Sequence, residues 1–363
     1  MKKVKVYGAG SIGNHLANAS RRMGWKVDIC DVDSEALRRT REEIYPARYG
    51  KWDESIGLYA NKDIPVGGYD LIVIGTPPDS HMLLARQAVK ERPAAILVEK
   101  PLCTPDLAGA QELLDEAAAA GVHVFTGYDH VVGKSAQLFG KLLRERAVGE
   151  LDTIDVEFRE FWGGIFGAHP WLSGPADTYL GFWQRGGGSC GEHSHAANLW
   201  QYFAHEAGIG RVVEVAAEME FVRDGRVDYD KLCLMTVRTE SGLVGRVVQD
   251  VVTRPTRKWA RVQGSAGFLE WYCGHEPGID SVIHALDAGV VSNTRVSKTR
   301  PDDFVQELKH IEAVLEGSLA DSPISLVRGL ETMMVIAAAH KSAMEKRVVR
   351  IDYSKGYVPE ALS

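Results

Sequence analysis

The sequence predicts an α/β protein of two domains, in which a doubly wound parallel sheet is followed by a domain with a large, mostly antiparallel sheet. The chain has 363 residues, and roughly 150 residues per domain is usual. Apolar strand patterns alternate with amphipathic helix patterns in the first third of the chain. In the remainder, strand patterns follow one another without helices between them, which favours antiparallel pairing.

The elements of the first third are short apolar strands, of the kind that is buried on both faces, separated by helices. Ile12, Leu16, Ala19 and Met23 share one helical face, and Ser34 is expected to be the N-cap of the next helix. Strands are expected at residues 4–7, 26–31, 71–74, 94–98 and 122–125, and helices at 12–23, from 34, around 83–89 and at 105–120.

The second part begins with a helix near residues 135–146 and ends with two helices near 303–316 and 324–345. Between them, strands are expected at 151–161, 211–222, 231–239, 243–253, 258–263 and 267–272. No repeat or low-complexity linker separates the two parts. We therefore expect a first domain over residues 1–127 and a second over 128–363, joined by packing contacts.

Composition excludes several classes of protein. The 42 basic and 49 acidic side chains give a net charge of −7, which disfavours nucleic acid as a partner. No apolar run is long enough for a membrane span, and the N-terminus has no signal-peptide pattern. The five cysteines are scattered and never spaced C-x-x-C, so we expect no disulfide framework, no metal and a cytoplasmic location.

A glycine-rich loop follows the first predicted strand. Gly8, Gly10 and Gly13 form G-x-G-x-x-G between a strand and a helix, the context in which this pattern binds a dinucleotide. The following helix, expected from Ile12, offers free N–H groups and a positive dipole end to the pyrophosphate. Asp31 ends the second strand, where a carboxylate accepts hydrogen bonds from the ribose hydroxyls of NAD and repels a 2′-phosphate. We therefore predict NAD as the cofactor.

Lys100 follows another apolar strand, within the run Glu99-Lys100-Pro101. Ligands of open α/β sheets bind at the carboxyl ends of the strands, so Lys100 is expected to point toward the binding cleft. Its ammonium group can hydrogen-bond a substrate oxygen. The alternative is an ordinary surface lysine.

Several motifs together resemble the glucose-fructose oxidoreductase, inositol dehydrogenase and MocA (Gfo/Idh/MocA) family, over essentially the whole chain. The motifs are GAGSIG at 8–13, GTPP at 75–78 with His81, EKP at 99–101, GYDH at 127–130, GGG at 186–188 with Ser194 and His195, and AAAHKSA at 337–343. The resemblance implies a Rossmann domain, an open-faced antiparallel sheet domain, and hydride transfer between nicotinamide and a sugar-like carbon. It also places residues near the cofactor: Gly8, Gly10, Ser11, Ile12, Gly13, Asp31, Thr76, Pro77, His81, Glu99 and Lys100.

The resemblance also implies an active-site histidine. His195 follows Ser194, a plausible N-cap, at the start of a predicted helix, and an imidazole suits a general base near neutral pH. The family's usual aspartate four residues earlier is replaced by Gly191, and Glu192 is the nearest carboxylate in the sequence. We predict catalytic roles for Lys100, His195 and Glu192. The neighbouring His193 gives a metal-site alternative, which helix geometry disfavours.

The segment 161–191 is rich in glycine and aromatic residues, holding nine glycines. A long connection of this kind is more often functional than a plain linker. Trp162, Trp171 and Trp183 are expected to stack on a sugar ring, although core packing is the alternative for each. The full set of substrate-binding residues that we predict is Lys100, Asp129, His130, Trp162, Trp171, Trp183, Arg185 and His195.

The sequence thus predicts an NAD-dependent dehydrogenase or reductase that acts on a ring CH–OH group of a sugar, sugar derivative or cyclitol. One alternative is an NAD-binding regulator without catalysis. Another is an NAD-dependent glycosidase of related fold. The resemblance further implies a homodimer or homotetramer that assembles through the C-terminal sheet.

Overall fold

The computed structural model describes residues 1–60, 63–167, 169 and 171–363, which pack as two compact units. The first unit comprises Met1–Leu102, Gly109–Asp129 and Arg300–Gly329. The second comprises Cys103–Ala108, His130–Thr299 and Leu330–Ser363.

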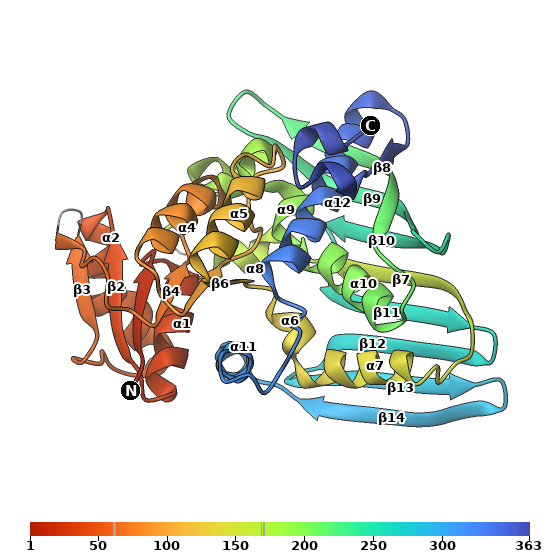
Figure 1. The fold of residues 1–363 in the computed structure, drawn as a ribbon, viewed down its shortest axis with the longest axis horizontal. Coiled ribbons are helices and arrows are strands. Elements are labelled where there is room, and N and C mark those ends of the chain that lie inside the picture. The colour runs from red at the N-terminus through yellow and green to blue at the C-terminus, as the bar shows by residue number, and fades with distance from the viewer. Residues whose placement is uncertain (61–62, 168, 170) are drawn as a thin grey trace. The chain divides into compact units, whose positions relative to one another are not determined.

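The first unit contains a six-stranded parallel sheet with the strand order β3-β2-β1-β4-β5-β6, as the sequence predicts for a doubly wound fold (Figure 1). Its strands are β1 (Lys3–Tyr7), β2 (Lys26–Asp31), β3 (Gly57–Ala60), β4 (Leu71–Ile74), β5 (Ala95–Val98) and β6 (His123–Thr126). Its helices are α1 (Ser11–Arg22), α2 (Ser34–Arg39), α3 (Tyr45–Tyr49), α4 (His81–Lys90), α5 (Ala110–Ala120) and α11 (Arg300–Leu315).

The helix boundaries of this unit differ from expectation at two places. The carboxylate of Asp33 accepts a hydrogen bond from the backbone N–H of Glu35, so Asp33 and not Ser34 is the N-cap of α2. Helix α5 begins at Ala110 rather than near residue 105, because Gly109 takes a left-handed conformation with φ of 78° just before it.

The second unit contains a nine-stranded sheet with the order β14-β13-β12-β11-β7-β10-β9-β8-β15, antiparallel except for the pair β7–β10. Its strands are β7 (Leu151–Arg159), β8 (Val212–Arg223), β9 (Asp228–Thr239), β10 (Val244–Asp250), β11 (Arg257–Gly264), β12 (Gly267–Glu276), β13 (Ile279–Leu286), β14 (Gly289–Ser297) and β15 (Val349–Arg350). Its helices are α7 (Lys134–Arg144), α8 (Trp162–Gly167), α9 (Gly188–Glu192) and α10 (His195–Glu206), while α6 (Asp129–Val132) and α12 (Leu326–Glu345) run from one unit into the other.

One face of this sheet is covered by helices α7, α9 and α10 (Figure 1). Along β7, Ile154, Val156 and Phe158 are fully buried. Of the alternate residues, Asp155 and Arg159 are partly exposed, while Glu157 is buried beneath Arg246 and Arg257, with which it pairs. The two-residue period of a strand therefore gives the sheet one apolar face and one face rich in charged side chains.

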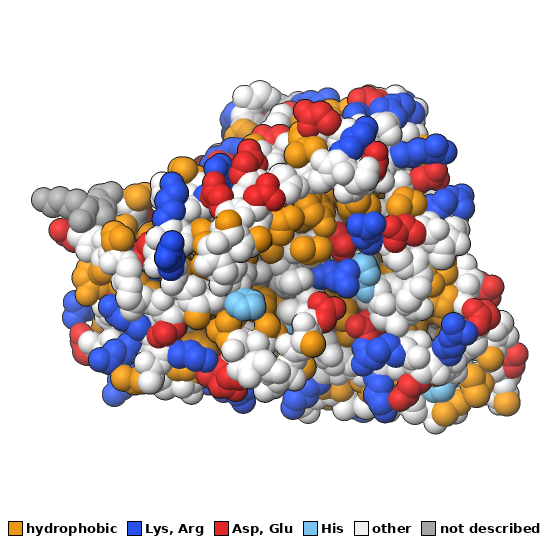
Figure 2. All heavy atoms as spheres, in the orientation of Figure 1, with side chains coloured by type: hydrophobic (Ala, Val, Ile, Leu, Met, Phe, Trp, Pro, Cys, Tyr) orange, Lys and Arg blue, Asp and Glu red, His pale blue; other side chains and the backbone are white. Residues whose placement is uncertain are grey.

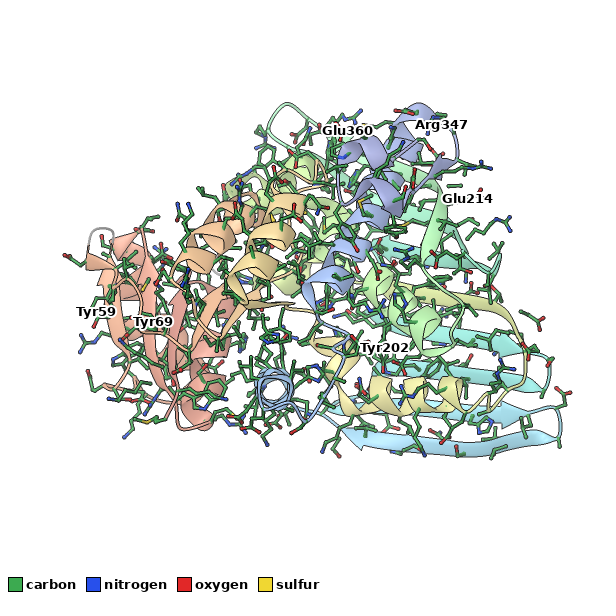
Figure 3. The ribbon with its side chains drawn as sticks, in the orientation of Figure 1. Tyr59, Tyr69, Tyr202, Glu214, Arg347 and Glu360 are labelled. Atoms are coloured by element: carbon green, nitrogen blue, oxygen red, sulfur yellow. The ribbon has the colours of Figure 1, made fainter. Side chains whose placement is uncertain are left out.

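The strands β3, β13, β14 and β15 were not expected from the sequence. Nearly all residues of β14 are exposed, so it shows no alternation of apolar and polar side chains. At the opposite edge, the two-residue strand β15 joins β8, which carries Glu214 (labelled in Figure 3). Glu214 pairs with Arg238 at 3.2 Å and with Arg350 at 3.1 Å.

The C-terminal half of the sequence contributes α11 to the first unit, a grouping that the expected boundary at residue 127 does not include. Helix α11 packs against α1, and two ion pairs support the contact: Lys2 with Glu312 at 2.5 Å and Arg22 with Asp302 at 2.8 Å. The two compact units are therefore not two consecutive stretches of the sequence.

Charged side chains of both signs are interspersed over the face of the molecule in Figure 2. Among the described residues, no helix is both long enough and apolar enough to cross a membrane.

Candidate functional site

The Gly8–Gly13 loop lies at the point where the strand order of the first unit reverses. It follows β1, and the turn at Thr76 and Pro77 follows the neighbouring strand β4. Ligands of doubly wound sheets bind at this switch point, outside the carboxyl ends of the strands. The structure therefore brings two of the motifs predicted to bind the cofactor to one edge of the sheet.

Each of the three loop positions suits glycine for a different structural reason. Gly8 has φ of 101°, and a Cβ atom there would lie 2.6 Å from the carbonyl oxygen of Gly75. A Cβ atom on Gly13 would overlap the carbonyl oxygen of Gly8. Gly10 is the N-cap residue of α1, and a Cβ atom there would meet nothing within 4 Å. The open space over Gly10, at a helix N-terminus, fits a pyrophosphate.

Asp31 lies at the end of β2, beside the glycine loop. Its carboxylate accepts hydrogen bonds from the backbone N–H of Ala9 at 2.8 Å and of Asp33 at 2.9 Å. The arginines of the following helix are paired with acidic groups: Arg38 with Glu35 and others, and Arg39 with Asp33. This arrangement suits ribose hydroxyls better than a 2′-phosphate.

We expect Asp31→Ser to weaken NAD(H) and to lessen the discrimination against NADP(H), because the substitution removes a negative charge that would repel a 2′-phosphate. Isothermal titration with both cofactors measures the change. Asp33→Ser, at the neighbouring N-cap, is the control and should leave the preference unchanged. Wild-type protein that binds NADP(H) as tightly as NAD(H) would contradict the role of Asp31.

Glu99 and Lys100 directly follow β5, next to β4 in the sheet. Glu99 is 5% exposed, and a Cβ atom on Gly127 would lie 2.8 Å from its carboxyl group. Burial, and then the nearby charge of Asp129, raise the pKa of Glu99 to about 8. Lys100 is partly exposed at the carboxyl edge of the sheet, where the sequence placed it.

His81 was predicted to lie near the cofactor, and it is 1% exposed. One ring nitrogen is 2.7 Å from the carbonyl oxygen of Thr76, and the other is 3.0 Å from that of Pro101. Burial lowers the pKa of His81. The ring thus ties the turn after β4 to the segment that follows Lys100, which is a supporting role.

Glu307 on α11 is a functional candidate that the sequence analysis missed. It is fully buried, and neither of its carboxyl oxygens has a hydrogen-bond partner among the described residues. Burial raises its pKa well above the usual range, and the charges of Glu99 and Asp129 add to the effect. Arg300 offsets part of this charge and lies 3.7 Å from Asp129. The sequence signal that could have revealed Glu307 is its place within the apolar stripe of α11 that includes Phe304.

We expect the first unit to lose stability as pH rises from about 4.5 to about 8. The reason is that the carboxyl group of Glu99 binds its proton more tightly in the folded state than in the unfolded state. The charged groups around Glu307 are Glu99, Asp129, Asp303 and Arg300. Glu307→Gln should therefore match wild type near pH 5 and be more stable than wild type near pH 9, because the buried carboxyl group of Glu307 has to lose its proton there.

Thermal unfolding across this pH range measures the effect of Glu307→Gln. Glu316→Gln, at an exposed residue just after α11, is the matched control and should leave the pH dependence unchanged. A Glu307→Gln variant that is less stable than wild type at pH 9 would show that the carboxylate is ionised and stabilising.

The segment from Gly188 to Ser194, which contains α9 and leads into α10, is hydrogen-bonded to strands β9 and β10. Gly188 has φ of 76°, and a Cβ atom there would overlap the carboxylate of Asp230. Asp230 is fully buried and accepts hydrogen bonds from the Ser189 hydroxyl at 2.6 Å and the Cys190 N–H at 2.7 Å. Gln249 donates to the carbonyl oxygen of His193 at 2.5 Å. Two sheet residues thus anchor the segment that leads to His195.

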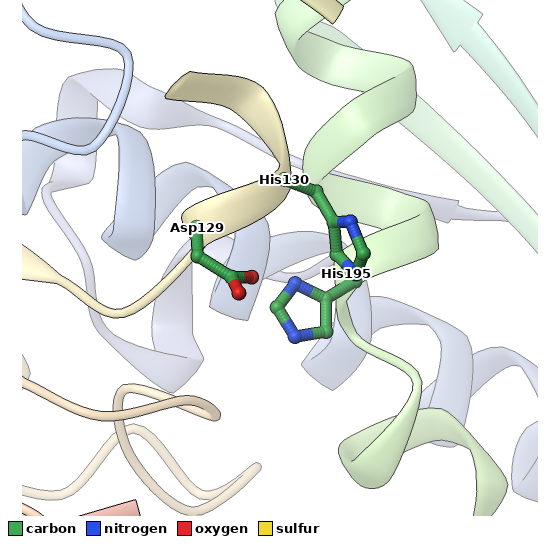
Figure 4. A group of neighbouring side chains, drawn as sticks. All are labelled: Asp129, His130 and His195. Atoms are coloured by element: carbon green, nitrogen blue, oxygen red, sulfur yellow. The ribbon is translucent and has the colours of Figure 1, made fainter. Parts of the chain in front are cut away.

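His195 is the first residue of α10 and is partly exposed. Ser194 stands at the N-cap position, as expected, but its side chain makes no capping hydrogen bond. The ring of His195 lies at right angles to that of His130, with centroids 4.6 Å apart (Figure 4). Glu192 ends α9, three residues earlier, and is also partly exposed.

The three tryptophans of segment 161–191 have different environments; residues 168 and 170 of this segment lie outside the described residues. Trp162 is 5% exposed and packs with Leu180 and Val251. Trp183 stacks on His340, with centroids 4.7 Å apart. Trp171 is 37% exposed. The structure therefore places Trp162 in the core and Trp171 at the surface. Arg185 also lies at the surface.

Residues 2–128 match the model of a family described as "Oxidoreductase family, NAD-binding Rossmann fold", the Gfo/Idh/MocA family. No curated protein sequence matches the chain.

Solved structures are similar to the chain over nearly its full length. One is an oxidoreductase from Agrobacterium radiobacter in complex with NAD+, L-tartaric acid and magnesium, with TM-score 0.73, 18% identity, and coverage of 96% of this chain and 98% of that chain. Another is a putative myo-inositol dehydrogenase from Sinorhizobium meliloti, with TM-score 0.71, 20% identity, and coverage of 96% and 99%. A third is the WlbA dehydrogenase from Bordetella pertussis in complex with NADH and UDP-GlcNAcA, with TM-score 0.70, 17% identity, and coverage of 96% and 98%. At these identities the likeness concerns the fold.

Proposed function

Because residues 2–128 belong to the NAD-binding domain of the Gfo/Idh/MocA oxidoreductase family, we propose that the protein is an NAD-dependent dehydrogenase or reductase acting on a ring carbon of a sugar, sugar derivative or cyclitol. The observation that carries the proposal is the glycine loop at the sheet's switch point with Lys100 at the end of β5. The substrate class is consistent with two of the solved structures of similar fold, one in complex with UDP-GlcNAcA and one of a putative myo-inositol dehydrogenase.

In the proposed reaction, Lys100 and His195 act on the same substrate hydroxyl. NAD, held by the glycine loop and Asp31, would supply the hydride acceptor for oxidation of the alcohol or the hydride donor for reduction. The imidazole of His195 takes the hydroxyl proton as the C–H bond breaks, and the remaining carbon and oxygen form a carbonyl. The ammonium group of Lys100 hydrogen-bonds the oxygen and stabilises its developing negative charge.

The residues that would hold the cofactor fit it. The loop of Gly8, Gly10 and Gly13 leaves open space at the N-terminus of α1, and Asp31 lies beside the loop at the end of β2. In the sequence, Asp129 and His130 come shortly after β6, and we propose that they orient the substrate. The role of Glu192 as an orienting acid for His195 stays a prediction.

The test is turnover of purified protein with NAD and a panel of cyclitols, free sugars, sugar acids, nucleotide sugars and hydroxy acids. We expect NADH to form with at least one ring alcohol. Binding of NAD without turnover of any panel member would favour a non-catalytic regulator. Release of free sugar from a glycoside, without net NADH, would instead identify a glycosidase.

We expect Trp171→Ala to raise the KM for substrate several-fold without changing the affinity for NAD, because Trp171 is the most exposed of the three tryptophans. Trp162→Ala should instead lower stability by about 3–5 kcal/mol, the usual loss for a buried aromatic side chain. Substrate kinetics and thermal unfolding of both variants and of Trp183→Ala separate the two effects. Unchanged kinetics in all three variants would refute a role of this segment in substrate choice.

A homodimer or homotetramer through the charged face of the nine-stranded sheet is also proposed. Helices cover the other face, while Leu234 on β9 is 42% exposed. Light scattering after gel filtration, with Leu234→Asp as the disrupting variant, tests the assembly. The cytoplasmic location stays a prediction from the cysteine pattern.

A further inference from the structure

We propose that His130 is a positioning residue for His195, and that Lys298 holds His130 in one tautomer. The proposal rests on the catalytic role that the proposed function gives to His195. The packing of the two rings and Lys298 is nevertheless a property of the second unit alone, so it is testable without turnover.

Two aromatic rings restrict the orientation of the His195 imidazole. The ring of His130 crosses it at 87°, with centroids 4.6 Å apart (Figure 4). The ring of Phe158 stacks on it at 23°, with centroids 6.1 Å apart. Phe158 also lies 5.3 Å from His130, and it is fully buried on β7. The His195 ring therefore has one neighbour along its face and another at right angles, which limits its rotation.

Lys298 determines which nitrogen of His130 carries the proton. Its ammonium nitrogen lies 3.5 Å from Nδ1 of His130. An ammonium group has only donors, so in a hydrogen bond between the two groups Nδ1 is the acceptor, which favours the tautomer of His130 with its proton on Nε2. A second proton on His130 would place two cations side by side, which disfavours the imidazolium form. The carboxylate of Asp129, which lies within 4.8 Å of a ring nitrogen of each histidine, acts in the opposite direction.

Lys298 is itself placed by a buried hydrogen-bond network. Its ammonium group lies 3.8 Å from Asp280 on β13. Asp280 is 3% exposed and accepts hydrogen bonds from the Ser135 hydroxyl at 2.8 Å and the Gly274 N–H at 2.9 Å. Ser135 in turn accepts one from the Trp271 indole at 3.0 Å. The cation beside His130 is thus anchored to the sheet.

The charged and titratable groups around the pair come from each packed element. They are Asp129, which precedes His130 in α6, Asp280 on β13, Lys298 after β14 and Cys273 on β12, whose Sγ is 3.8 Å from the lysine nitrogen. Within this set Lys298 is the cation that directly faces His130. Removing its charge should make protonation easier for both imidazoles, while the rings keep their positions.

The first experiment follows the titration of the His195 ring by NMR of isotope-labelled histidine in the full-length protein. Lys298→Met should raise the titration midpoint of His195 by up to roughly one pH unit. Lys346→Met, which removes a lysine paired with Glu218 at the end of α12, is the control and should leave it unchanged. An unchanged midpoint in Lys298→Met would overturn the proposal.

The second experiment compares His130→Phe, which keeps a ring without nitrogens, with His130→Asn, whose amide oxygen can accept from Lys298. His130→Phe should lower kcat about tenfold to a hundredfold at constant affinity for NAD, and His130→Asn should recover part of the loss. Equal loss in both variants would overturn the role of the Lys298 contact. A shifted midpoint in Lys298→Met without any change of rate in the His130 variants would uphold the coupling and instead refute His195 as the base of the proposed function.

Discussion

Lys100→Ala is expected to lower kcat by about 10²–10³-fold, because a charged donor aimed at a developing alkoxide stabilises the transition state by roughly 3–4 kcal/mol. The variant should fold and bind NAD, since Lys100 is partly exposed at the end of β5 and is not part of the apolar core. Lys90→Ala, at an exposed residue that ends α4, is the matched control and should turn over like wild type.

His195→Ala should cause a comparable loss, because a positioned general base contributes about 10²–10⁴-fold. The losses in the Lys100→Ala/His195→Ala double variant should not multiply, since both groups are proposed to act on one oxygen. Glu192→Gln should matter less than either. Steady-state kinetics of these variants decide the mechanism. Wild-type turnover in Lys100→Ala, on the true substrate, would refute the proposed chemistry.

Alanine at Gly13 is expected to destabilise the fold, whereas alanine at Gly10 is not. A Cβ atom on Gly13 would overlap the carbonyl oxygen of Gly8, so β1 and α1 would have to separate. Gly13→Ala is therefore expected to destabilise the first unit by several kcal/mol, beyond the usual range of about 0.5–3 kcal/mol for single substitutions, and to abolish NAD binding.

Gly10→Ala is the matched comparison, because its Cβ atom would meet nothing within 4 Å. The variant should keep the wild-type Tm but lose at least about tenfold in affinity for NAD, equal to about 1.4 kcal/mol, since the new methyl group occupies the space where a pyrophosphate approaches the backbone. Thermal unfolding and calorimetric titration measure both effects. Wild-type affinity in Gly10→Ala would place the pyrophosphate elsewhere.

Five of the six strands of the first unit, all but β3, and its glycine loop were predictable because their signals are local. β4 and β5 are fully buried four-residue segments, and buried parallel strands appear in a sequence as continuous apolar runs. The glycine loop needs only its two flanking elements for its geometry. Lys100 could be placed at the carboxyl edge because it directly follows β5.

Other parts of the fold carry no such signal. β14 is an edge strand with nearly all side chains exposed, so burial left no pattern in its sequence. The grouping of α11 with the first unit depends on contacts such as Lys2 with Glu312, which are 310 residues apart. Glu307 looked like an ordinary charged helix residue until its full burial became visible.

The sequence by itself therefore determined the doubly wound sheet, the dinucleotide loop and the place of Lys100, since each depends on residues close together in the chain. Only the tertiary structure decided which side chains surround His195. His130 lies 65 positions before it in the sequence, and Lys298 lies 168 positions from His130. Their proximity follows from the packing of α10 on β7 and from the order of β7, β11, β12, β13 and β14 in one sheet. Pairing between distant strands leaves no local pattern for a sequence to display.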